Sequence, residues 1–230
     1  MSNSIIYNEM KEKKALRFFK KFPFWGLCFV AIGILGIIIA SKLSTLNITW
    51  LYIISVIAII IGIAAIVLYF PNRASNEEMD QFLKEDLEKL NKWVQSKLNI
   101  NDKLVAPAII LCGYHKKDNG YFKECLDDKI RYMPIESVFI NFTETQVLTY
   151  RIIFWLGGEI DKECSDEIFY KDIVSVKTEN TKVGILEDIP LAEFKLTTTG
   201  GTSISQKTFA IEAAEQAVQT IRNLVRTWKK

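Results

Sequence analysis

Two long apolar runs dominate the pattern of hydrophobic and polar positions along the chain. They cover 22–41 and 48–70, and neither contains a charged residue. As α-helices they would measure about 30 Å and about 34 Å, close to the roughly 30 Å hydrocarbon core of a bilayer. Because only six residues separate them, we predict a two-helix transmembrane hairpin over 22–70. A cleaved signal peptide is the alternative, but its apolar region would be shorter and no second span would follow.

A helical pattern follows the hairpin. Ser75 and Glu78 have the spacing of a capping box, in which a hydroxyl and a carboxylate bind the free amides at the start of a helix. Apolar residues then recur on one face as far as Leu98, while the other face is acidic and then mixed. We predict an amphipathic connecting helix over 75–98 that packs on a soluble domain. Pairing between subunits as a coiled coil is the alternative.

From residue 105 the pattern changes to short β-type runs separated by turn residues. Gly157-Gly158 and Gly200-Gly201 mark two of the turns, and 179–191 is predicted as an irregular loop. An amphipathic helix is predicted over 208–229. Strands in close succession with one closing helix predict a 105–230 domain of α+β class, either a small antiparallel barrel or two packed sheets. The predicted strands are 105–112, 121–126, 130–142, 146–156, 159–170, 173–178, 193–198 and 202–206.

Positive charge is concentrated before the first apolar run. The N-terminal segment 1–21 has six Lys or Arg and two Glu, and only Lys42 lies between the runs. Cytoplasmic flanks of membrane helices are enriched in Lys and Arg, so we expect both termini in the cytoplasm, on an inner or plasma membrane. Residues 71–230 have 22 Lys or Arg against 25 Asp or Glu. This mildly acidic balance argues against nucleic acid as a partner.

Basic and aromatic residues flank the hairpin, where the bilayer meets water. Residues of these types anchor helix ends at headgroup level, and the basic segment can contact anionic lipid. The residues expected at the membrane interface are Lys20, Lys21, Trp25, Trp50 and Arg73.

Small residues recur inside both apolar runs. Gly33 and Gly36 lie in the first, and Ala58 and Gly62 form a small-x-x-x-small step in the second. Such residues let helix backbones approach closely in lipid. We expect them to pack within the hairpin, with oligomer assembly as the alternative. Since no ionisable residue lies near the middle of either run, coupled ion transport is not expected.

Three stretches of the predicted β domain resemble bacterial pleckstrin-homology-like and GRAM-like domains. They are 141–150 (NFTETQVLTY), 167–176 (EIFYKDIVSV) and 194–201 (FKLTTTGG), followed by the final helix. The chain is also similar to bacterial membrane proteins with a two-helix anchor. The resemblance implies binding of lipid, peptide or protein rather than catalysis. The basic cluster of phosphoinositide-binding members has no counterpart beyond Lys116-Lys117.

The single histidine is the main candidate for chemistry. His115 follows Cys112 by three positions, and Cys125 and Cys164 could complete a zinc site. A Cys–His nucleophile pair is another possibility. The spacing matches no zinc ribbon or finger, and buried cysteines are usually small hydrophobes. No glycine-rich phosphate loop is present, so no catalytic residue, metal or cofactor is expected.

These observations predict a membrane-anchored cytosolic binding or scaffold module without enzymatic activity. Its partners are expected to be the lipid bilayer and a protein at the cytosolic membrane face, and a homo-oligomer is allowed. The alternative is an oligomeric pore-forming or membrane-disrupting effector gated by ligand binding to the soluble domain.

Overall fold

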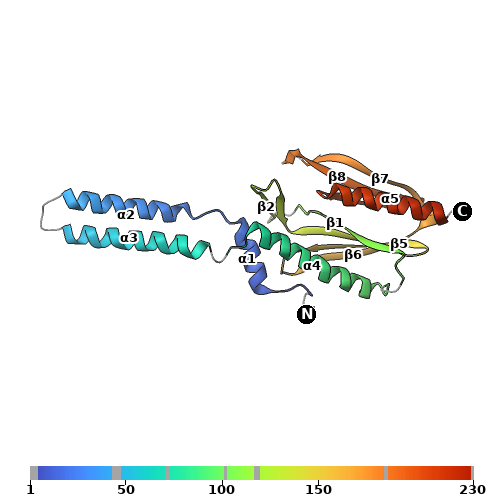
Figure 1. Cartoon of the computed structure of the whole chain (residues 1–230), viewed down its shortest axis with the longest axis horizontal. Helices are drawn as coiled ribbons and strands as arrows, with labels where there is room; N and C mark the ends of the chain where they lie inside the picture. The colour runs from blue at the N-terminus through green and yellow to red at the C-terminus, as the bar shows by residue number, and fades with distance from the viewer. Residues whose placement is uncertain are drawn as a thin grey trace. The chain divides into compact units, whose positions relative to one another are not determined.

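The computed structural model describes residues 5–42, 48–70, 73–100, 103–116, 120–183 and 186–228. The chain forms two compact units. One joins the residues up to Glu12 to Asp80–Lys230, and contains every strand. The other is Lys13–Met79 and contains the two apolar helices. Figure 1 labels most of the helices and several strands.

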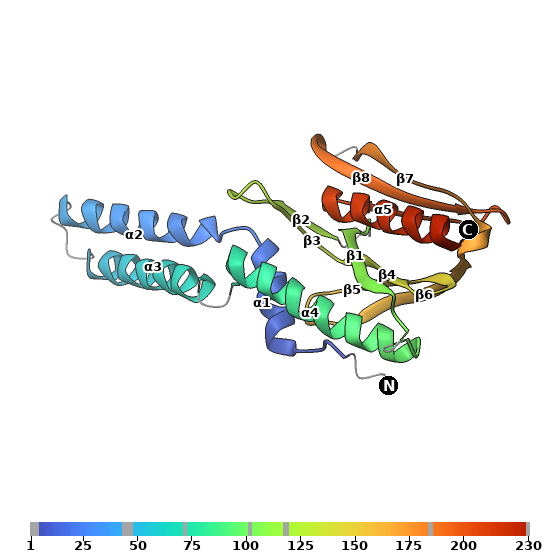
Figure 2. The same cartoon turned by 45° about the vertical axis from the view of Figure 1, so that its right-hand side comes forward.

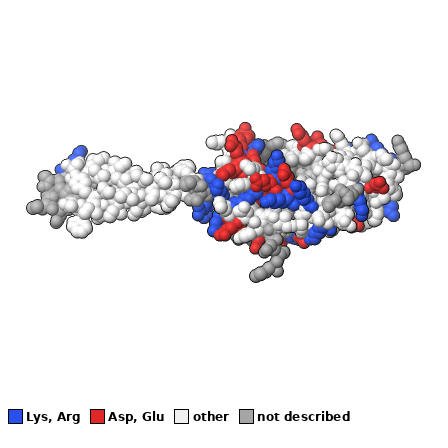
Figure 3. Space-filling model, turned by 60° about the horizontal axis from the view of Figure 1, so that its bottom comes forward, with Lys and Arg blue, Asp and Glu red and all other residues white. Residues whose placement is uncertain are grey.

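The apolar runs are two antiparallel helices, α2 (Phe24–Lys42) and α3 (Ile48–Tyr69). Both are long and apolar enough to cross a membrane, and only 17% and 11% of their most apolar windows are buried. A core helix of a soluble protein would be mostly buried, so this exposure fits lipid contact better. Figure 3 shows an almost uncharged hairpin surface, whereas the sheet-containing unit has intermixed charges. Of the predicted turn 42–47, residues 43–47 lie outside the described residues.

Helix α1 (Glu9–Phe19) is a feature that the sequence pattern did not predict. Its buried positions are Lys11, Ala15 and Phe18, which have the i, i+4, i+7 spacing of one helix face. The lysine on this face made the segment look like a polar tail.

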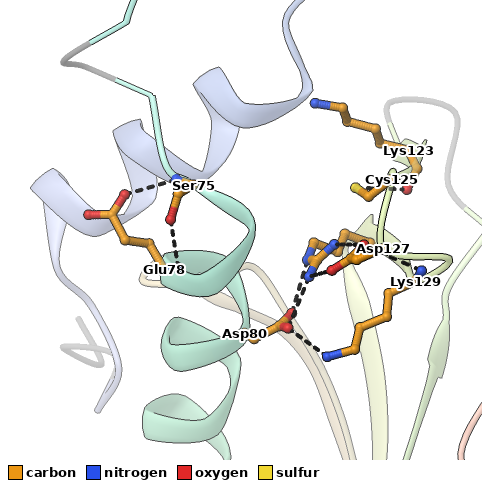
Figure 4. A network of polar contacts seen from close by, with 8 residues as sticks. Ser75, Glu78, Asp80, Lys123, Cys125, Asp127 and Lys129 are labelled. Carbon is orange, nitrogen blue, oxygen red and sulfur yellow. Dashed lines mark hydrogen bonds and ion pairs between the residues drawn. The ribbon is translucent and has the colours of Figure 1, made fainter.

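Helix α4 (Asn76–Lys97) begins with the predicted capping box. The Ser75 amide donates to Glu78 Oε2 at 2.9 Å, and the Glu78 amide donates to Ser75 Oγ at 3.1 Å (Figure 4). The two side chains thus bind amides that would otherwise lack helical partners.

The largest sheet has four antiparallel strands in the order β1-β4-β5-β6. Pro134, which has no amide to donate, separates β3 from β4, so the single strand predicted over 130–142 is wrong. The strands are β1 (Ala106–Tyr114), β2 (Tyr121–Glu124), β3 (Ile130–Met133), β4 (Ile135–Phe142), β5 (Gln146–Phe154) and β6 (Ile160–Phe169), of which β2 and β3 pair separately.

A second antiparallel sheet has the order β7-β8-β9. Its strands are β7 (Ile173–Val183), β8 (Leu186–Thr198) and β9 (Ser203–Thr208). The loop predicted over 179–191 is therefore wrong, because most of it belongs to the β7–β8 hairpin. Residues 184 and 185 lie outside the described residues.

The two sheets and helix α5 (Ile211–Trp228) enclose the main core. Helix α4 lies across the other face of the four-stranded sheet (Figures 1 and 2). At one edge, a Cβ on Gly113 would collide with the Lys207 carbonyl, so only glycine lets β1 come this close to β9. No described strand of one sheet pairs through its backbone with a strand of the other. The domain is thus an antiparallel sheet domain with a C-terminal helix and not a closed barrel.

Candidate functional site

The most suggestive surface feature is a groove between strand β7 and helix α5. Strand β7 lies at the edge of its sheet and pairs only with β8 among the described strands. The groove has a volume of about 320 Å³. Its lining residues are Ile173, Val174, Ser175 and Val176 from β7 and Arg222, Val225 and Arg226 from α5.

The groove combines backbone, apolar and cationic groups. Arg222 Nη2 donates to the Val176 carbonyl oxygen at 3.0 Å, so a backbone acceptor of β7 faces α5. Val174 is 64% exposed, and Arg226 adds a second guanidinium. Arg222 already binds the Val176 carbonyl, but β7 is an edge strand with alternating side-chain sites, which suits an extended peptide. The two guanidinium groups favour a peptide that carries carboxylates.

A buried ion pair holds the N-terminal segment on the sheet unit. Lys11 Nζ donates to Asp86 Oδ1 at 2.6 Å, and the two side chains are 6% and 0% exposed. Lys11 also lies over the Phe82 ring, 5.1 Å from its centroid. The other carboxylate oxygen, Asp86 Oδ2, accepts from the Gly157 amide at 2.8 Å. We call Asn8, Lys11, Asp86 and Gly157 the clasp.

Backbone contacts complete the clasp. The Asn8 amide donates to the Gly157 carbonyl at 2.6 Å, and Asn8 Oδ1 accepts from the Lys11 amide at 3.1 Å. Burial raises the pKa of Asp86, and the Lys11 ammonium and Gly157 amide oppose that rise. A buried carboxylate needs such partners, because leaving it unpaired would cost several kcal/mol.

Gly157 is required by this arrangement for two reasons. Its φ is +65°, a left-handed conformation that favours glycine. A Cβ at this position would also lie 2.9 Å from both the Glu12 nitrogen and Lys11 Cβ. The hairpin glycine predicted from the sequence therefore also makes room for the N-terminal segment.

A second polar network connects α4 to the β2–β3 hairpin (Figure 4). The Arg131 side chain is 6% exposed and binds Asp80 through Nε at 2.9 Å and Asp127 through Nη2 at 2.7 Å. Lys129 binds Asp80 as well, at 3.0 Å. The hydrogen bond from Arg131 lowers the pKa of Asp127 to about 2.

The structure does not assemble the histidine and cysteines into one site. His115 Nδ1 lies 3.2 Å from Glu136 Oε2, and Cys112 Sγ lies 3.2 Å from Ser137 Oγ. Burial raises the pKa of Cys112 to about 11, which opposes the thiolate that a nucleophile needs. Cys164 is exposed. Among the described residues no group of three or more His, Cys, Asp or Glu could hold a metal ion.

The residues expected at the membrane interface lie at both ends of the hairpin. Trp25 is near the start of α2 and Trp50 near the start of α3, and both are exposed. Lys20 and Lys21 are exposed just before α2, and Arg73 is half-buried just after α3.

Three of the four expected packing residues lie between α2 and α3. A Cβ on Gly62 would lie 2.5 Å from the Gly26 carbonyl, and one on Gly33 would lie 2.6 Å from the Ser55 carbonyl. A Cβ on Gly36 would collide with the Ser55 hydroxyl. Ala58 is half-buried. These positions favour packing within the hairpin over the oligomer alternative.

Sequence reasoning missed the groove and the clasp. Groove residues 173–176 and 222–226 are distant in sequence and become neighbours only when α5 packs. The clasp did leave a signal, because Asp86 interrupts the otherwise apolar series Phe82, Leu90 and Val94 at helical spacing. A charge inside an apolar stripe indicates a buried partner.

No protein-family model, curated protein or solved structure matches the chain.

Proposed function

We propose that the chain is a membrane-anchored binding module without catalytic activity. The α2–α3 hairpin crosses a bacterial inner or plasma membrane, and the sheet-containing unit and both termini lie in the cytoplasm. The anchor raises the effective concentration of the unit for partners at the membrane face. We take the sheet-containing unit to be a PH-like domain that binds lipid, peptide or protein. Its two antiparallel sheets and C-terminal helix support this proposal.

One observation carries the topology. Lys11 precedes both apolar helices and Asp86 follows them, yet the two side chains form one buried pair. An odd number of membrane crossings would place these residues on opposite sides of the bilayer. The pair thus requires two crossings or none, and the exposed apolar surface of both helices favours two. The surplus of Lys and Arg before α2 supports the cytoplasmic side.

The β7–α5 groove is the proposed binding surface. An extended peptide would add a strand to the edge of β7, and its carboxylates would contact Arg222 and Arg226. The resemblance to PH-like domains implies a lipid, peptide or protein ligand, and the groove favours a peptide.

Peptide-display selection against the full-length chain in nanodiscs tests this function. We expect acidic sequences with alternating apolar positions, and about tenfold weaker binding of a selected peptide to Arg226→Glu, since loss of a charged contact costs about 1.5–3 kcal/mol. Lys92→Glu reverses an exposed charge on α4 and should bind normally. Equal losses in both variants, or selected peptides without acidic residues, would contradict the groove assignment.

A further inference from the structure

The cations near the hairpin differ in whether they have carboxylate partners. Lys11 pairs with Asp86, and Lys14 pairs with Glu78 at 3.1 Å. In contrast, Arg17, Lys20 and Lys21 are exposed, and in the described part of the chain they form no ion pair. These three cations are therefore available to an anion from outside the protein.

Arg73, just after α3, likewise forms no ion pair within the described part of the chain. Its guanidinium carbon lies 5.4 Å from the Phe18 ring centroid and 5.6 Å from that of Tyr69, so two aromatic rings hold the side chain by cation–π contacts. Arg73 Nε is buried and has no hydrogen-bond partner among the described residues. Such a donor is costly unless a ligand or water satisfies it.

Tyr69 also holds the chain segment that enters α2, at the end of the hairpin where α2 begins and α3 ends (the hairpin base). The Tyr69 hydroxyl donates to the Lys20 carbonyl at 2.9 Å, and the Tyr69 ring lies 5.4 Å from the Phe22 ring. The backbone before α2 is therefore held beside the end of α3. Lys20 and Lys21 therefore lie in the chain segment that is held beside the same helix end as Arg73.

We propose that Arg73, with Lys20, Lys21 and Arg17, binds the phosphate of an anionic phospholipid headgroup in the cytoplasmic leaflet. A planar guanidinium can give a phosphate two parallel hydrogen bonds, and the flexible cations add attraction to the negative leaflet surface. This inference rests on the proposed membrane insertion but not on the β7–α5 groove.

Native mass spectrometry of the full-length chain tests the site. The chain is released from nanodiscs of phosphatidylcholine alone or of an equal mixture with phosphatidylglycerol, and retained lipid is counted. We expect selective retention of phosphatidylglycerol by the natural chain and about tenfold less by Arg73→Gln, the loss of one charged hydrogen-bonding contact. Arg73→Lys should retain an intermediate amount, since it keeps the charge but loses the fork.

Controls separate this site from general charge and from the anchor itself. Lys92→Gln removes one exposed charge from α4 and should retain phosphatidylglycerol normally. Equal retention by Arg73→Gln and Lys92→Gln would overturn the site. The site would also be overturned if inorganic phosphate stabilised the chain in detergent against unfolding as well as phosphatidylglycerol does, without displacing bound lipid. Alkali extraction of the natural chain from membranes would instead contradict the anchor.

Discussion

Lys11 Nζ lies 2.6 Å from Asp86 Oδ1, although the two residues are 75 positions apart and flank the entire apolar hairpin. Both side chains are buried. The described residues up to Glu12 are thus part of the same folded unit as the sheets after the hairpin, which a flexible basic tail would not be.

Removing either partner of this pair should be strongly destabilising. Lys11→Ala leaves the buried Asp86 carboxylate without its counter-charge, and such losses cost about 3–5 kcal/mol. Urea unfolding of the full-length chain in detergent measures the free energy of unfolding. Lys14→Ala is the matched control, because its pair with Glu78 is partly exposed and worth at most about 1 kcal/mol. Similar small losses in both variants would contradict the buried clasp.

Replacing Gly157 should release the N-terminal segment. In Gly157→Ala the new Cβ meets Lys11 and the Glu12 backbone, in addition to the cost of a left-handed alanine, about 1–2 kcal/mol. Gly201→Ala is a close control, because its φ is +79° and a Cβ there meets nothing within 4 Å. Limited proteolysis should cut before residue 12 faster in Gly157→Ala than in Gly201→Ala. Equal rates would show that the segment does not pack there.

The hairpin should depend on Gly62 more than on Ala58. Gly62→Leu places atoms against the Gly26 carbonyl and Val30, so the helices must separate or shift, at a cost of about 1–3 kcal/mol. Ala58→Leu starts from a half-buried position and should cost less. Thermal unfolding and mass in mild detergent measure both effects. If Ala58→Leu breaks a larger assembly into monomers, the small residues pack between subunits and not within the hairpin.

Acid should weaken the network around Arg131. The pKa of Asp127 is about 2 in the folded chain, below the ordinary 3.8, so folding favours the carboxylate. This contribution is present above pH 3.8 and is lost as pH falls through about 2. The stability difference between the natural chain and Asp127→Asn should therefore shrink over that range. A stability difference that stays constant over that range would contradict the assignment.

Much of the secondary structure could be predicted from period alone. The apolar runs, the Ser75–Glu78 capping box, most of the strands and the final helix follow from local patterns that tertiary packing did not override. Helix α1 could not be predicted, because a charged residue, Lys11, occupies a position that faces the core. The β7–β8 hairpin was mistaken for a loop because its residues 179–191 lack strand alternation and include Pro190.

The candidate sites were harder to predict than the elements. The groove needs α5 to lie beside β7, and that contact depends on packing between segments about 50 residues apart. The hairpin-base residues Lys20, Lys21 and Arg73 could be predicted, because membrane flanks have a compositional signature. The contacts of Arg73 with two aromatic rings could not be predicted, since Phe18 and Tyr69 both reach Arg73 only after the hairpin closes.

The most direct test of the central claim is the sidedness of the two chain ends. Full-length chain with a single-cysteine tag at each terminus, in a background without native cysteines, can be labelled in sealed right-side-out vesicles with a membrane-impermeant maleimide. We predict that neither tag reacts until the vesicles are permeabilised, after which both react. Labelling of one tag alone in sealed vesicles would contradict the account, because Lys11 and Asp86 could not then form one buried pair.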